Sequence, residues 1–105
     1  MSINLDEIAS SFGCSVGDVK ELLGGMITES SNIIEIIETS IVSEDYDSII
    51  MASEMIKGKI NHFQLTDMDS AIDAIIASGK AEDKAGSQTH FNSLKSALEI
   101  VIGEL

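Results

Sequence analysis

The side chains of this 105-residue sequence that could take part in chemistry are few: Cys14, the charged pair Glu54 and Lys57, and the histidines His62 and His90. A neutral imidazole is a nucleophile near pH 7 and can accept a phosphoryl group. Neither histidine has a second histidine or a carboxylate cluster at i,i+4, so no metal site is predicted. The lone cysteine has no intrachain partner, and a buried, unreactive thiol is the simplest interpretation.

The usual arrangements of an enzyme active site do not occur in the sequence. It contains no nucleophile with an adjacent base, no paired carboxylates in an apolar setting and no glycine-rich phosphate loop. We therefore expect a protein that binds another protein, without enzyme activity and without a cofactor.

Length and composition predict one small helical domain covering residues 1–105. Hydrophobic residues make up 44% of the chain despite a net charge of -12, which is enough apolar material for one core. Proline is absent, and β-branched residues recur at helical spacing. The N-terminus has no signal-peptide pattern and no apolar run approaches a membrane span, so we expect a cytoplasmic protein that does not bind membranes.

Apolar periodicity predicts an all-α fold, an up-and-down antiparallel four-helix bundle with a short extra N-terminal helix. The short helix ends at Gly13, and a long helix over about 16 to 42 begins at a capping box of Ser15 and Asp18. Asp45 caps the third helix, Thr66 with Asp69 starts the fourth, and Gly79 ends it. Residues 80–86 form a connector. The last helix carries a near-heptad apolar stripe of Phe91, Leu94, Leu98, Val101 and Leu105.

The third helix has an unusual second face. At 100° per residue, the face that contains Glu54 is centred about 140° from the core stripe, which consists of Ile49, Ser53, Ile56, Ile60 and Phe63. Apolar side chains around a charged pair on a solvent face are typical of a docking surface. The alternative is that Gly58 only admits a neighbouring helix and the methionines fill the core. The predicted docking set is Ile50, Met51, Glu54, Met55, Lys57, Gly58, Asn61 and Leu65.

At these residues the chain resembles the histidine phosphotransfer (HPt) domains of two-component phosphorelays. Their hallmark is an Ala-His-x-Leu-Lys-Gly run in a helix that begins with Asp and an aromatic residue. Here the corresponding stretches read Asp45-Tyr46 and Ser53-Glu54-Met55-Ile56-Lys57-Gly58. The resemblance implies the same order of five helices, and a surface for the receiver domain of a response regulator or of a hybrid histidine kinase.

Glu54 stands where the resemblance places the phosphorylatable histidine. A carboxylate is a poorer nucleophile than imidazole and cannot form a phosphoramidate, so we expect docking without phosphate transfer. What Glu54 keeps is negative charge, and it can pair with Lys57 at i,i+3 for about 0.2 to 0.5 kcal/mol.

Two other hypotheses remain open at this point. His62 follows Glu54 by eight residues, about 80° around the helix, and could serve as the phosphoryl carrier in an active phosphorelay. Residues 5–23 have the spacing of a helix-turn-helix, but the second helix offers only Lys20 to a phosphate backbone beside Asp18 and Glu21. Because residues 1–53 carry ten acidic side chains against one lysine, we expect no binding to nucleic acid. The sequence predicts no particular oligomeric state.

Overall fold

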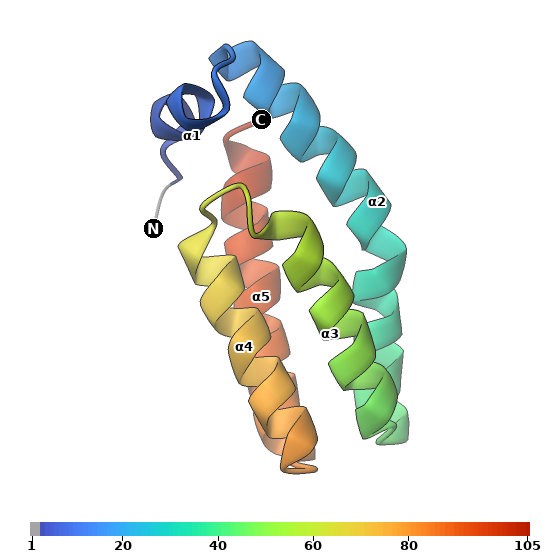
Figure 1. Ribbon diagram of the computed structural model, residues 1–105. Helices are drawn as coiled ribbons and strands as arrows, with labels where there is room; N and C mark the ends of the chain where they lie inside the picture. The colour runs from blue at the N-terminus through green and yellow to red at the C-terminus, as the bar shows by residue number, and fades with distance from the viewer. Residues whose placement is uncertain (1–2) are drawn as a thin grey trace.

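Five helices account for most of residues 3–105, the part of the chain that the computed structural model describes. They are α1 (Leu5–Phe12), α2 (Val16–Ser43), α3 (Tyr46–Ile60), α4 (Thr66–Lys80) and α5 (Lys84–Gly103). Successive long helices run antiparallel, while the short α1 lies at the end of the bundle where the chain also terminates (Figure 1). The predicted all-α bundle with a short N-terminal helix is confirmed.

Local side-chain chemistry sets where three of the long helices begin. Ser15 Oγ accepts a hydrogen bond from the Asp18 backbone N–H at 3.1 Å, and the Asp18 carboxylate accepts one from the Ser15 N–H at 3.3 Å. The predicted capping box of α2 is therefore confirmed. Asp45 caps α3 through the N–H of Ser48. Asp83 caps α5, so the connector before this helix is shorter than the sequence suggested.

The fourth helix differs from prediction at both ends. Thr66 is its first residue, but the cap position belongs to Leu65, which provides no side-chain hydrogen bond. Gly79 does not end the helix, because α4 continues to Lys80. An added Cβ on Gly79 would lie 3.0 Å from Ile50 Cγ1 of α3, so this glycine instead permits close contact between two helices.

The core lies along the inner sides of α2 to α5. The predicted stripe of α3 is buried as expected, although Phe63 reaches the core from the turn after the helix rather than from the helix itself. A ring–ring contact of 5.5 Å between Phe63 and Phe12 ties that turn to α1. The fully buried residues of α3 are Ile49, Ser53, Ile56 and Ile60.

The stripe predicted for the last helix is only partly correct. Phe91, Leu94 and Val101 are buried, whereas Leu98 is half-buried and Leu105 is 43% exposed beyond the helix end. The reason is that α5 packs mainly against α4 and less against α2. Ala97 lines a groove together with residues of α4 and is buried, although the predicted near-heptad stripe did not include it.

Between residues 3 and 105, none of the helices is both long and apolar enough to cross a membrane.

Candidate protein-docking site

Helix α3 lies between α2 and α4 and leaves one side open to solvent (Figure 1). Met51 and Met55 on this side are 62% and 52% exposed, whereas Ile49 and Ile56 on the inner side are fully buried. We call the open side, formed by Asp47, Met51, Glu54, Met55 and Gly58, the outward face of α3. Met51 and Met55 therefore do not fill the core.

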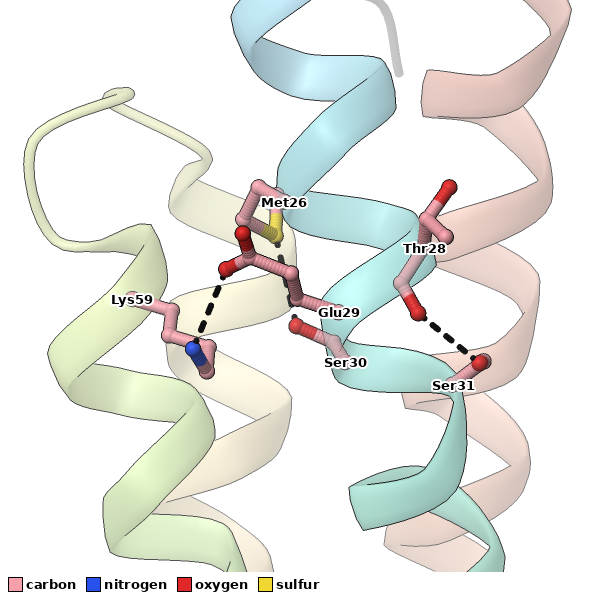
Figure 2. Close-up of polar contacts among 6 residues, drawn as sticks. All are labelled: Met26, Thr28, Glu29, Ser30, Ser31 and Lys59. Carbon is pink, nitrogen blue, oxygen red and sulfur yellow. Dashed lines mark hydrogen bonds and ion pairs between the residues drawn. The ribbon is translucent and has the colours of Figure 1, made fainter.

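Two cross-helix ion pairs mark the edges of the outward face. Lys59 Nζ lies 3.3 Å from Glu29 Oε2 of α2, and Figure 2 shows the two side chains spanning the gap between these helices. On the other edge Lys57 Nζ binds Asp73 of α4. Gly58 lies between the two lysines in sequence and is therefore about 100° around the helix axis from each of them. It points away from both neighbouring helices.

Lys57 binds Asp73 and does not form the predicted pair with Glu54. The hydrogen bond to Asp73 raises the pKa of Lys57 above its ordinary value of 10.5, and the negative charges of Asp73 and Asp69 add to the rise. Because an i,i+3 pair on an exposed helix is worth only a few tenths of a kcal/mol, the carboxylates of α4 compete successfully for this lysine. Glu54 is left exposed with no hydrogen-bond or ion-pair partner among residues 3–105.

Gly58 is exposed in the interior of α3. An added Cβ would meet no atom within 4 Å, outside the helix's own backbone. The alternative interpretation, in which Gly58 admits a neighbouring helix of the same chain, is therefore wrong. Gly79 has that role instead, with Ile50 as the close neighbour.

Three members of the predicted docking set need correction or refinement. Leu65 is only 4% exposed and lies in the core, because α3 ends at Ile60 and the chain then turns. Gln64 completes the turn with a φ of 56°, in the left-handed region. Asn61 is exposed but sits at the helix end, and Ile50 is half-buried against α4.

The sequence prediction missed Asp47, an exposed acidic residue one turn before Met51. It lies on the same side as the later members, because positions 47, 51, 54 and 58 are spaced by four, three and four residues. Extending that spacing toward the helix start would have found it.

The remaining reactive side chains are dispersed. His62 is exposed in the turn after α3, His90 is half-buried on α5, and Cys14 is half-buried beside α1. Across residues 3–105 no three side chains of His, Cys, Asp or Glu come together in a way that could hold a metal ion.

The segment with helix-turn-helix spacing corresponds to α1, a short turn and the start of α2. Val19 of the supposed recognition helix is buried, and this helix is the start of α2, which is 28 residues long in all and runs along the bundle. Asp18 and Glu21 are exposed beside Lys20, so this end of α2 has no excess of positive charge to attract a phosphate backbone.

Comparison with known proteins adds no relative: a scan against models of protein families, a search of curated proteins and a search of solved structures each found no match for this chain.

Proposed function

We propose that the outward face of α3 docks the receiver domain of a response regulator or of a hybrid histidine kinase in the cytoplasm, and that the protein carries no phosphoryl group itself. The observation that carries this proposal is the open space in front of Gly58 together with the two exposed methionines beside it, Met51 and Met55. The HPt-like residues from Asp45 to Gly58 give the class of partner.

A glycine in a helix interior costs about 1 kcal/mol relative to alanine. At Gly79 the cost is offset by a close helix contact, but at Gly58 no contact within the chain makes use of the missing side chain. A partner that approaches the backbone at Gly58 would make use of it. Gly24 and Gly25 of α2 have the same empty space, so at Gly58 it supports docking in combination with the exposed methionines beside it.

The apolar residues beside Gly58 also favour protein binding. Met51 and Met55 are more than half exposed, one turn apart on the same side. Methionine side chains are flexible and polarizable, so they adapt to an apolar partner surface, and burying them would contribute to affinity.

The absence of phosphate transfer follows from the chemistry of two residues. Glu54 has one carboxylate where a carrier needs imidazole nitrogen, and its single charge is a poor substitute for a phosphohistidine. Lys57, which could have steadied a phosphoryl group, is held by Asp73. A phosphorylated receiver should therefore transfer no acid-labile label to the protein. Label recovered on His62 or His90 would instead support the carrier hypothesis.

The decisive experiment for docking is the Gly58→Arg variant. Since an added Cβ meets no other helix and the position faces solvent, the free energy of unfolding should hold or rise. Binding to a panel of receiver domains, measured by calorimetry, should weaken more than tenfold, about 1.4 kcal/mol. Equal binding by Gly58→Arg and the parent protein would contradict the proposal.

Gly24→Arg is the matched control. Gly24 is also a helix-interior glycine whose added Cβ would meet nothing within 4 Å. It lies five residues before Glu29, which puts it about 140° around α2 from the side chain that reaches α3. This variant should bind like the parent. Glu54→His is a second test, because restored phosphotransfer would show that the receiver-docking geometry survives around the missing nucleophile.

A further inference from the structure

The outward face of α3 is acidic even though it has a lysine at each edge. Lys57 and Lys59 are already paired with carboxylates of α4 and α2. Asp47 and Glu54 are both exposed, and neither has a hydrogen-bond or ion-pair partner within residues 3–105. The uncompensated charge on this face is therefore that of the two carboxylates.

The two carboxylates form a row along the helix. They are seven residues apart, which corresponds to two turns and about 10.5 Å of rise. At 100° per residue they are separated by only about 20° around the axis. The row lies on the part of the face nearer to Lys57, and hence nearer to α4.

An apolar row runs beside the acidic one. Met51 and Met55 are turned toward the Lys59 edge, and hence toward α2. The pairing of Lys59 with Glu29 places residue 59 of α3 opposite residue 29 of α2. Because the two helices run antiparallel, Ile36, seven residues after Glu29, lies opposite residue 52 of α3. Ile36 is 48% exposed and lengthens the apolar row onto α2.

We infer that the partner element for this face is a basic amphipathic helix, with two lysine or arginine side chains two turns apart against Asp47 and Glu54 and apolar side chains against Met51, Met55 and Ile36. This inference rests on the proposed docking function and specifies the surface that the partner must present. Cations at i and i+7 of a helix share one side, and their spacing matches that of the two carboxylates.

Charge argues against two other occupants. A second copy of this chain would bring another net charge of -12 to a face that is itself acidic. An anionic membrane surface would be repelled in the same way. A basic helix gains from the long-range field of the whole protein as well as from the two local contacts.

The test uses two synthetic helical peptides of identical composition, each with two lysines and three leucines in an alanine and glutamine background. In the first peptide the lysines stand at i and i+7 beside the leucines, and in the second they lie on the opposite side. Titration into isotope-labelled protein should give amide shifts at Met51, Met55 and Gly58 with the first peptide. The second peptide should bind at least threefold more weakly.

Two matched double variants of the protein distinguish peptide binding at this face from non-specific attraction of a basic peptide to an acidic protein. Asp47→Asn with Glu54→Gln should weaken binding of the first peptide about three- to tenfold. Glu21→Gln with Glu35→Gln removes the same charge from exposed positions of α2 and should change the affinity less than twofold. Equal losses in the two double variants, shifts spread over the whole acidic surface, or no binding of the first peptide would overturn the inference.

Receiver binding keeps the two proposals distinguishable. If Gly58→Arg abolishes binding of a receiver domain while Asp47→Asn with Glu54→Gln binds like the parent, the inference about charge fails and the docking function stands. If Gly58→Arg binds receivers like the parent, the docking function itself fails.

Discussion

The two sides of α3 differ in how deeply their residues are buried and in what those residues contact. On the inner side Ile49 and Ile56 are fully buried. Near this side Gly79 of α4 makes room for Ile50, whose Cγ1 would lie only 3.0 Å from an added Cβ. On the outward side Met51, Met55 and Gly58 face solvent, and the space before Gly58 is empty. Both sides contain apolar residues, but only the inner side uses them within the chain.

The two interior glycines Gly79 and Gly58 therefore differ in whether a contact within the chain explains them. The glycine of α4 is explained by its neighbours, whereas the glycine of α3 is explained by nothing inside the molecule. Gly24 and Gly25 of α2 also have no close neighbour, but Gly58 differs from them because it lies beside the two exposed methionines, Met51 and Met55. This combination supports a use outside the molecule. The variants below measure the contrast directly.

The largest expected effect comes from truncating adjacent residues on the two sides. Ile56→Ala should lower the free energy of unfolding by about 2 to 5 kcal/mol, because it leaves a cavity in a closed core. Met55→Ala should change it by less than about 0.5 kcal/mol, since the side chain is largely in water. Urea denaturation of both variants checks the pair. Similar losses would mean that the outward face is covered in the folded protein.

A smaller effect is expected from enlarging the two glycines. Gly79→Leu should destabilise by about 1 to 3 kcal/mol, because the new side chain must displace Ile50. Gly58→Leu should hold stability or raise it by up to about 1 kcal/mol, since leucine is a strong helix former and the site is open. Thermal and urea melts of the two variants provide the comparison. Destabilisation by Gly58→Leu would show that α3 contacts another part of the chain at this point.

The fold could be predicted because its signals are local. Apolar spacing marked each long helix, and Ser15 with Asp18 marked the start of α2. The end of α3 carries no such signal, because Asn61 and Gln64 are compatible with helix as well as turn. Extending the helix through this turn placed Leu65 on the predicted docking face, whereas it is buried in the core.

The candidate site was harder to predict, since its charges depend on packing. Lys57 pairs with a residue sixteen positions away, and only the antiparallel approach of α4 brings Asp73 within reach. Gly79 was ambiguous for a related reason. Glycine is common at helix ends and also at close helix contacts, and sequence alone does not distinguish these roles.

The smallest expected effect concerns the ion pair at the edge between the two sides. Lys57 has a pKa raised above 10.5, first by the hydrogen bond from its ammonium group to Asp73. A raised pKa in the folded state means that the pair stabilises the fold fully below the unfolded pKa, about 10.5, and that this stabilisation is lost as pH rises through the folded pKa.

The difference in melting temperature between the parent and Lys57→Met should therefore be constant near neutral pH and shrink above about pH 10.5. Melts of the two proteins at matched pH cancel the contributions of all groups that the two proteins share. Asp73→Asn should remove the same alkaline component, because it removes the acceptor that holds Lys57. A difference that stays unchanged to pH 12 would show that Lys57 is free of Asp73 in solution, and then available to a partner on the outward face.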